Sequence, residues 1–352
     1  MMARLTLLCP TYNRHQYLDR SCRFWQNRDV DVIYADGSQS AFAGTCLAAS
    51  NLRYMHSPVG FYQRLAAMSA EVGTPYVCMM GDDEYYIPSS LHICVDYLDS
   101  HPDYVACMGR AIGFSRSLGD IVLKNQYPLL HGRSLSDDLA LTRLTKHFSA
   151  YVPSHCYAVT RTDVFRSAID AALSNKLDVY AISELIEEFL IVSAGKSIVL
   201  PILYWLRSFE EPPLRNTGDI SLNLSKGFDE WWKHLENNEA KKRFCYELSA
   251  SCSNSVDRCL VEHIFDLYHF YAYPNPGFSR GASLRWLMSA LPGFVKKTNG
   301  FLLAAAKPFA QYLLNPSIQS GFTLLSLRGQ GVQIDHKALA ECLASIKSSW
   351  KA

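Results

Sequence analysis

Short apolar segments alternate with amphipathic segments along the first third of the chain. The apolar segments have the length of strands, and the segments between them repeat their apolar positions at the spacing of a helix. Strands are expected at residues 5–9, 31–35, 52–55 and 76–80, and helices at residues 15–26 and 60–72. Such alternation is typical of right-handed βαβ units, so the pattern predicts an α/β fold with a mostly parallel sheet.

The alternation continues beyond residue 88. Pro88 suits the first turn of a helix, and this helix is expected to reach about Ser100. Further strands are expected at residues 105–108, 155–160 and 197–200, and further helices at residues 162–173 and 182–194. Residues 228–269 have a helical pattern, which includes the pair Trp231-Trp232. The last third of the chain is therefore expected to be mainly helical.

Composition narrows the class of protein. The chain has 352 residues, of which 49% are hydrophobic and 19% charged, so a globular protein with a substantial core is expected. A formal net charge of +1 argues against a general nucleic-acid binder. The 11 cysteines include no CxxC pair, which argues against a structural zinc site and favours a reducing cytosol. The first strand is expected within four residues of Met1, so no signal peptide is expected, and no apolar run is long enough to span a bilayer.

Three consecutive acids, Asp82, Asp83 and Glu84, follow the expected strand at residues 76–80. The carboxyl ends of strands are where open α/β sheets bind their ligands. Clustered carboxylates repel one another, and Mg²⁺ or Mn²⁺ would neutralise them while also holding a phosphate. The alternative is an acidic surface turn without a ligand.

Two more short segments stand at expected strand ends: Pro10-Thr11-Tyr12-Asn13-Arg14 and Asp36-Gly37-Ser38. With Gly81-Asp82-Asp83-Glu84 and the following Pro88, this ordered set resembles the nucleotide-sugar-binding half of GT-A-fold glycosyltransferases, in particular the family 2-like inverting enzymes. The resemblance is good over residues 3–110 and looser over residues 150–205. It implies a GT-A domain over residues 1–215, with a nucleotide-sugar-binding half at 1–110, an acceptor half at 111–215, and a mainly helical region at 216–352.

The resemblance also implies roles for single residues. Asp36 matches the acid that contacts the nucleotide base, Tyr12 an aromatic that flanks it, and Asp82 the acid that faces sugar or ribose. Asp83 matches the acid that bridges Mn²⁺ or Mg²⁺ to the diphosphate. The remaining matches to the nucleotide-sugar site are Pro10, Thr11 and Arg14 in the first loop and Arg64 on the second helix. The chain departs from the family at Gly81, where many members carry Asp, and at Glu84, where they often have Asp.

Plainer interpretations of the same residues stay open. Tyr12 could cap the sheet, Asp36 before Gly37 is ordinary turn chemistry, and Arg64 could be a solvated helix residue.

An inverting transfer needs a base, because the acceptor hydroxyl loses its proton as it attacks the anomeric carbon. In the family the base comes from an acidic pair at the start of a helix that leads to a glycine and a strand. Ser183-Glu184 matches this place ahead of Gly195, so Glu184 is the candidate base, with Glu187 and Glu188 as competitors. Glu184 could instead simply favour the helix N-terminus through its dipole. His155 is a candidate contact for donor phosphate or acceptor, or a structural histidine.

The segment from Leu267 to Ile334 contains no Asp or Glu. It combines apolar and aromatic residues with six basic ones, Arg280, Arg285, Lys296, Lys297, Lys307 and Arg328. Such a segment is expected either to lie on an anionic membrane surface or to form a packing or homo-oligomer interface.

Together with these features, the resemblance implies a cytoplasmic glycosyltransferase, which the acid-free segment could hold at the inner face of the membrane. It would transfer a sugar from a nucleotide diphosphate sugar to a glycan or lipid-linked glycan hydroxyl by metal-assisted inversion. The resemblance implies a role in bacterial surface polysaccharide synthesis. The alternatives are a non-catalytic sugar-nucleotide-binding protein and a GT-A-like nucleotidyltransferase.

Overall fold

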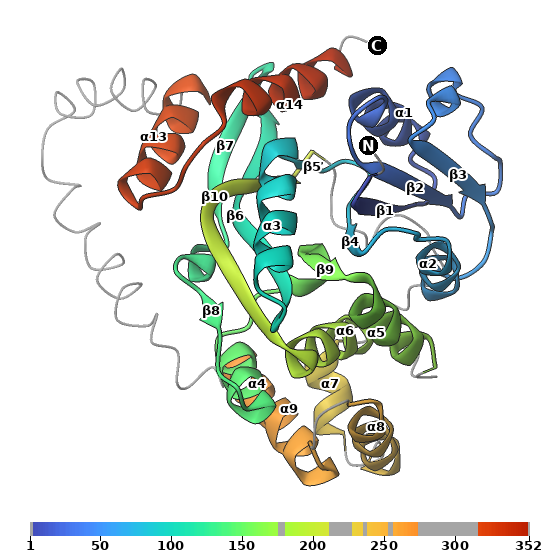
Figure 1. The fold of residues 1–352 in the computed structure, drawn as a ribbon, viewed down its shortest axis with the longest axis vertical. Coiled ribbons are helices and arrows are strands. Elements are labelled where there is room, and N and C mark those ends of the chain that lie inside the picture. The colour runs from blue at the N-terminus through green and yellow to red at the C-terminus, as the bar shows by residue number, and fades with distance from the viewer. Residues whose placement is uncertain are drawn as a thin grey trace, which may run out of the picture.

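A computed structural model describes residues 3–174, 180–210, 227–234, 238–252, 256–273 and 316–350. Its first part is a parallel sheet with helices on both faces (Figure 1). The strands are β1 (Leu5–Thr11), β2 (Asp31–Asp36), β3 (Leu52–His56) and β4 (Tyr76–Met79), and the helices are α1 (His15–Trp25), α2 (Phe61–Ala70) and the short 3-10 helix η1 (Thr45–Ala48). These elements agree with the expected ones to within a few residues.

The sheet continues through the second part of the chain. The added strands are β5 (Tyr85–Tyr86), β6 (Tyr104–Ser117), β7 (Asp120–Gln126), β8 (Ser134–Leu135), β9 (Val159–Arg161) and β10 (Lys196–Ser208). The main order is β3-β2-β1-β4-β9-β6-β10-β5, with β7 paired to β6 and β8 to β10. Because β9 is antiparallel to both β4 and β6, β6 and its parallel partner β10 run in the same direction as β1 to β4. The predicted α/β fold with a mostly parallel sheet is confirmed.

Side chains of β1 alternate between two apolar clusters, although nearly every position is apolar. Leu7 and Cys9 pack with Cys22 of α1, whereas Leu8 packs with Leu65 of α2 on the other face. A strand of a parallel sheet is covered on both faces, which explains the continuous apolar run.

The second part adds α3 (Pro88–Ser100), α4 (Ala140–Ser149), α5 (Thr162–Ser174) and α6 (Tyr180–Ala194), together with the short 3-10 helices η2 (Pro128–Leu130) and η3 (His155–Tyr157). The expected strand at residues 155–160 is only partly right, because η3 takes its first half and β9 begins at Val159. The backbone N–H groups of Ser154 and His155 donate to the carboxylate of Glu188, so they do not pair with a neighbouring strand.

The helices α7 (Phe228–Lys233), α8 (Asn238–Ser251) and α9 (Arg258–Ala272) pack together and against α4. Trp231 and Trp232 are buried, and Trp232 packs against Phe228 and Phe265. The helical pattern over residues 228–269 is thereby confirmed. The expected domain boundary between residues 215 and 216 lies outside the described residues and remains a prediction. Lys296, Lys297 and Lys307 also lie outside them, so the expected role of these residues at a membrane surface or interface remains a prediction too.

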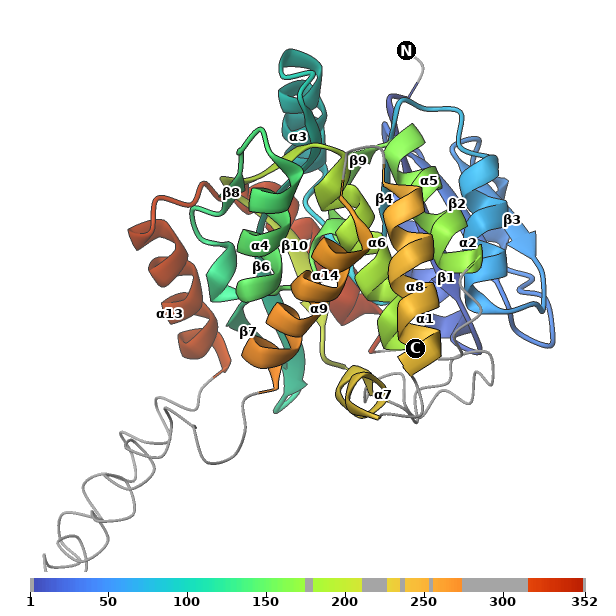
Figure 2. The ribbon, with the colours of Figure 1, turned by 90° about the horizontal axis from the view of Figure 1, so that it is seen from below.

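Two last helices, α13 (Pro316–Gly329) and α14 (His336–Ser348), return to the sheet (Figures 1 and 2). Helix α13 lies along β7, where the hydroxyl of Thr323 donates to the carbonyl of Leu123 over 2.8 Å. Between the two helices, Gln333 exchanges backbone hydrogen bonds with Pro201 and Leu203 of β10. None of the described helices is both long enough and apolar enough to cross a membrane.

Candidate active site

Three neighbouring parallel strands bring the expected donor-binding segments to one edge of the sheet. Thr11 ends β1, Asp36 ends β2 opposite Thr11, and Asp82 follows β4. The Thr11 hydroxyl donates to the Asp82 carboxylate over 2.6 Å. Pro10 lies where β1 still pairs with β2 but has already left β4, a place at which its missing N–H costs little.

The acidic turn is neutralised by an arginine of the first loop. One guanidinium nitrogen of Arg14 lies 3.3 Å from Asp82, and the other lies 2.6 Å from Asp83. The Asp82 side chain is 3% exposed and that of Asp83 is 15% exposed. Burial raises the pKa of Asp82 to about 7, although Arg14 pulls it down. Asp83 is therefore the more accessible of the two carboxylates for a ligand.

Asp36 is buried and accepts several hydrogen bonds. Ser38 donates its backbone N–H over 2.9 Å and its hydroxyl to one carboxylate oxygen, while Tyr54 and His15 contact the other oxygen over 2.8 and 2.9 Å. Burial alone would raise the pKa of Asp36, but these hydrogen bonds outweigh it and lower the pKa. Asn13, in the left-handed region at φ 55°, donates its N–H to Ser38 and so ties the first loop to this turn.

Arg64 lies beneath the turn that carries Asp36. It is buried rather than solvated, donates to the carbonyl of Val59, and lies 6.0 Å from the ring of Tyr12. A Cβ atom on Gly37 would stand 2.1 Å from this guanidinium. Any larger residue at position 37 would therefore displace this guanidinium, and Arg64 belongs to the same group of residues as Tyr12 and Asp36.

The glycine that replaces the more usual acid at position 81 faces Glu84. A Cβ atom on Gly81 would lie 3.0 to 3.2 Å from Glu84 side-chain atoms, so Glu84 fills the space of the missing side chain. The indole N–H of Trp205 donates to Glu84 over 2.9 Å. Burial, followed by the charge of Asp83, raises the pKa of Glu84 to about 8.

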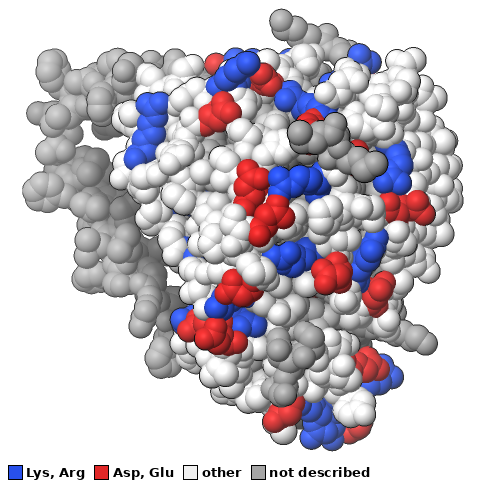
Figure 3. Space-filling view, in the orientation of Figure 1, with Lys and Arg blue, Asp and Glu red and all other residues white. Residues whose placement is uncertain are grey.

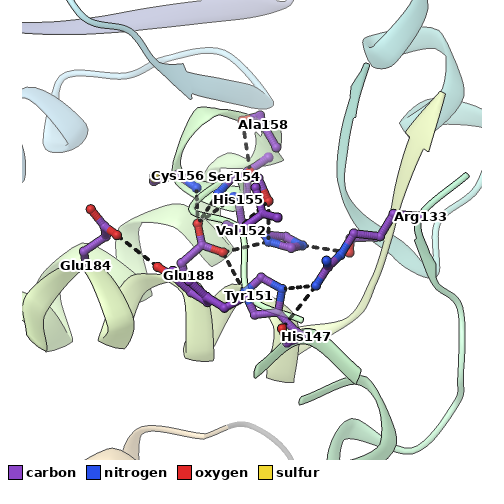
Figure 4. Close-up of polar contacts among 12 residues, drawn as sticks. Arg133, His147, Tyr151, Val152, Ser154, His155, Cys156, Ala158, Glu184 and Glu188 are labelled. Carbon is purple, nitrogen blue, oxygen red and sulfur yellow. Dashed lines mark hydrogen bonds and ion pairs between the residues drawn. The ribbon is translucent and has the colours of Figure 1, made fainter. Parts of the chain in front are cut away.

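The candidate base lies on α6. Glu184 accepts a hydrogen bond of 2.9 Å from the hydroxyl of Tyr151 (Figure 4). Burial, followed by the charge of Glu188, raises the pKa of Glu184 to about 7, while the Tyr151 hydrogen bond lowers it. Its competitor Glu187 has its pKa raised to about 8, mainly by burial and against a hydrogen bond from Tyr62. Both pKa values suit a group that exchanges protons near neutral pH.

Glu188, the third candidate, is committed to a buried network (Figure 4). One carboxylate oxygen accepts the backbone N–H groups of Ser154 and His155 over 2.8 and 2.7 Å. The other lies 2.8 Å from Nδ1 of His155 and 2.9 Å from Nε2 of His147. Burial would raise the pKa of Glu188, but the two histidines lower it overall. A carboxylate held in this way is a poor base, so Glu188 is the weakest of the three candidates.

His147, His155 and Glu188 lie close enough together to hold a metal ion, but their surroundings do not suit one. Arg133 donates to Nδ1 of His147 over 2.9 Å. A guanidinium has only protons to give, so the neutral His147 ring carries its proton on Nε2, toward Glu188. A metal ion on Nε2 would require this proton to move to Nδ1, where the half-buried Arg133 guanidinium already donates. Burial lowers the pKa of His147 to about 4, which keeps the ring neutral.

Helix η3 connects the base helix to the acidic turn. His155 at its start contacts Glu188, and Tyr157 at its end stacks on Trp205 with ring centroids 4.6 Å apart. Trp205 in turn donates to Glu84. The acidic turn and helix α6, which carries the candidate base, are thus joined through one short segment.

Several of these residues escaped the sequence analysis. His147, Tyr151, Arg133 and Trp205 stand in segments without a recognisable motif, and only their partners far along the chain give them a role. His155, suggested as a contact for donor or acceptor, is buried and bonded to Glu188 and Ser197. A cavity beside it, lined in part by Arg133 and Ser197, has room for about one water molecule.

The outer surface carries no broad area of one charge on the face seen in Figure 3. Basic and acidic side chains are interspersed there, in keeping with the net charge of +1.

Comparison with known proteins agrees with this arrangement. Residues 6–168 match the model of the family described as "Glycosyl transferase family 2". No curated protein matches the chain in sequence.

Solved structures with a similar overall arrangement include TarS 1-349 of S. aureus, at 13% identity and a TM-score of 0.48, over 99% of this chain and 90% of that one. The same protein in complex with UDP-GlcNAc gives a TM-score of 0.47, again at 13% identity and the same coverage. The mannosyltransferase PcManGT of Pyrobaculum calidifontis, in complex with GDP-Man and Mn²⁺, gives 0.43 at 12% identity, over 94% of this chain and 87% of that one. The match over residues 6–168 agrees with the family resemblance found in the sequence and with a fold of the GT-A type.

Proposed function

We propose that this glycosyltransferase moves a sugar from a nucleotide diphosphate sugar to a hydroxyl of a glycan or lipid-linked glycan, with inversion at the anomeric carbon and with help from a divalent cation. The observation that carries the proposal is the convergence of Thr11, Asp36 and Asp82 at three adjacent strand ends, with Asp83 accessible beside them. Ligands of open α/β sheets bind at such an edge.

The donor would lie along this edge. Tyr12, Asp36 and the underlying Arg64 would form the nucleotide side, and the loop residues Pro10, Thr11 and Arg14 would lead toward the diphosphate. The oxygens of Asp36 are already contacted by Ser38, Tyr54 and His15. Contact of Asp36 with a base would therefore exchange one of these bonds for a bond to the nucleotide.

The acidic turn suits a hard cation, because carboxylate oxygens are the ligands that Mg²⁺ and Mn²⁺ prefer. Asp83 would hold the cation directly, since its carboxylate is the more exposed one, and Asp82 would face sugar or ribose. When bound, the cation would neutralise charge on the leaving diphosphate. Arg14, already between the two acids, would contribute a second positive charge near the same place.

The chemical step would be one displacement. The acceptor oxygen bonds to the anomeric carbon, the bond from that carbon to the diphosphate oxygen breaks, and the acceptor proton passes to Glu184. Tyr151 would hold the Glu184 carboxylate in place through its hydroxyl. Glu184 is preferred over Glu188 because Glu188 already accepts several hydrogen bonds within the buried network.

A nucleotide panel tests the donor assignment. Thermal unfolding would be followed with UDP, GDP, dTDP and CMP, each with and without Mn²⁺, and transfer or donor hydrolysis would then be measured with the sugar nucleotides of the stabilising base. One nucleoside diphosphate should stabilise the chain in a Mn²⁺-dependent way, by about 2.7 kcal/mol at a hundredfold excess over Kd. Binding without any turnover would favour a non-catalytic sugar-nucleotide binder. Formation of a sugar nucleotide from a nucleoside triphosphate would favour a nucleotidyltransferase.

A lipid-linked acceptor would place the protein at the cytoplasmic face of a bacterial membrane, during surface polysaccharide synthesis. Exposed aromatic and apolar side chains on α9 and α13 support this part of the proposal, namely Phe270, Tyr271, Phe322 and Leu325. Co-sedimentation with anionic and neutral vesicles, at low and high salt, tests it. Equal and negligible pelleting with both vesicle types would favour the homo-oligomer interface instead, which light scattering would detect.

A further inference from the structure

The carbonyl of the metal-binding candidate Asp83 is held by an arginine of α1. The buried Arg20 donates from one terminal nitrogen to the Asp83 carbonyl over 3.0 Å, and the same nitrogen lies 2.7 Å from Glu210. Its other terminal nitrogen donates to the hydroxyl of Ser349 over 3.1 Å. One guanidinium therefore joins the acidic turn, the segment after β10 and the C-terminal part of the chain.

Trp350 completes this connection. Its indole N–H donates to the second carboxylate oxygen of Glu210 over 2.6 Å, and the guanidinium of Arg116 lies 4.9 Å from its ring. Glu210 thus receives Arg20 on one oxygen and Trp350 on the other. Both contacts fix the carboxylate that orients Arg20.

Helix α14 also contacts the strand that leaves the acidic turn. The hydroxyls of Tyr85 and Ser345 lie 2.9 Å apart, and the buried Cys342 packs next to Tyr86. Figure 1 shows α14 lying across one end of the sheet, from β7 to α1. The C-terminal part of the chain is therefore linked to the Asp83 carbonyl through Arg20, and it directly contacts Tyr85 and Tyr86, which follow the turn.

We infer that Arg20, Glu210 and Trp350 are positioning residues for the acidic turn, which makes the end of α14 a working part of the donor site. The role in the donor site rests on the proposed function, whereas the effect on the turn itself does not. Arg20 is suited to this task because its planar fork reaches partners in different directions at once. Lysine in its place would keep the charge but could not hold the carbonyl, Glu210 and Ser349 in the same geometry.

Arg20→Lys and Trp350→Phe test the inference, and Arg28→Lys is the matched control. Arg28 follows α1 by three residues and also connects this part of the chain to α14, through Glu341 at 3.1 Å, but its other hydrogen bond goes to a carbonyl of α1 and not to the acidic turn. Two quantities would be measured on the full chain. They are hydrogen exchange of the backbone amides of residues 82–86, and the Mn²⁺-dependent affinity for the nucleoside diphosphate identified by the panel.

Arg20→Lys and Trp350→Phe should accelerate exchange at residues 82–86 and weaken nucleotide affinity about tenfold, a change of about 1.4 kcal/mol. Arg28→Lys should leave both quantities near those of the wild type. Equal effects of all three substitutions, or no effect of Arg20→Lys on exchange, would overturn the inference, because the contacts would then only dock α14. A wild-type chain that binds no nucleotide while the exchange difference persists would contradict the proposed function and leave the positioning role supported.

Discussion

The guanidinium of Arg14 lies 2.6 Å from the carboxylate of Asp83, the acid proposed to hold the cation. Asp82, 3.3 Å from the same guanidinium, shares this positive charge. Two neighbouring carboxylates disfavour each other's ionised form unless a positive charge stands nearby. Arg14 supplies that charge, so a divalent cation would have to compete with it. Once displaced, the guanidinium could turn to the donor diphosphate.

Arg14→Gln should therefore have opposite effects on the two ligands. Without the competing guanidinium, Mn²⁺ alone should bind more tightly, by about tenfold if roughly 1.4 kcal/mol of competition is removed. Nucleoside diphosphate at saturating Mn²⁺ should bind more weakly, because a phosphate contact is lost. Calorimetric titration with Mn²⁺, and then with nucleotide, measures both affinities.

The control for this substitution is Arg23→Gln on α1, the helix that follows Arg14. Arg23 forms an exposed pair with Asp19, with a distance of 2.7 Å, and lies away from the acidic turn. It should leave both affinities unchanged. If Arg14→Gln weakened the binding of Mn²⁺ alone, Arg14 would be organising the metal site rather than competing for it.

Asp83→Asn should abolish Mn²⁺-dependent nucleotide binding while leaving the fold intact. The side chain is partly exposed at a strand end, and the amide keeps its shape but loses the negative charge that a cation needs. We expect an affinity at least tenfold weaker, or about 1.4 kcal/mol, with little change in the thermal midpoint. Asp103→Asn, which alters an exposed acid paired with Lys196, is the control. An Asp83→Asn protein with wild-type affinity in Mn²⁺ would move the metal site elsewhere.

The donor edge could be foreseen because its residues belong to local patterns. Thr11, Asp36 and Asp82 each follow an apolar run, and parallel strands end at a common edge, so their meeting follows from the strand order. The position of Glu184 could be foreseen in the same way, because it stands near the start of a helix that the sequence pattern predicts. The strands and the helix are predicted from residues that are close in sequence. The meeting of the strand ends follows from the rule that parallel strands end at a common edge of the sheet.

The contacts that shape the site could not be foreseen, because they join distant segments. Arg20 meets Ser349 across 329 residues of sequence, and Trp205 meets Glu84 across 121. No local sequence pattern predicts which residues far apart in the chain will form such contacts. The expected strand at residues 155–160 was partly wrong for the same reason, since a carboxylate on α6 takes the backbone N–H groups of Ser154 and His155.

The buried network around Glu188 should be structural and free of metal. Glu188→Gln would remove the buried charge that two histidines and two backbone N–H groups contact, and it should lower the free energy of unfolding by about 3 to 5 kcal/mol. Glu247→Gln, which alters an exposed helix pair, should change it by less than about 0.5 kcal/mol. Thermal unfolding of both variants provides the comparison.

Thermal unfolding in the presence of a chelator distinguishes a hydrogen-bonded network from a metal site. Incubation with EDTA should leave the thermal midpoint of the wild-type protein unchanged, and elemental analysis should find no stoichiometric zinc. A lower midpoint after EDTA treatment, restored by zinc, would mean that His147, His155 and Glu188 hold a metal ion after all.

The pH dependence of transfer should identify the base. A base must be ionised to accept the acceptor proton, and the pKa of Glu184 is raised to about 7, so kcat/KM should rise with pH through about 7. The Tyr151 hydroxyl donates to the carboxylate and stabilises its ionised form. Tyr151→Phe removes this hydrogen bond, which raises the pKa of Glu184 and moves the rising limb to higher pH. Glu184→Gln should lower turnover by roughly 10² to 10⁴ while donor affinity persists.

Tyr62→Phe is the matched control, because the Tyr62 hydroxyl forms a hydrogen bond with Glu187 rather than with Glu184. With Glu184 as the base, Tyr62→Phe should leave the midpoint of the rising limb in place, while Tyr151→Phe shifts it upward. The reverse result, a shift for Tyr62→Phe alone together with near-normal turnover of Glu184→Gln, would assign the proton transfer to Glu187. Because both substitutions remove only a tyrosine hydroxyl, a difference between them reports which carboxylate accepts the proton and not a general loss of packing.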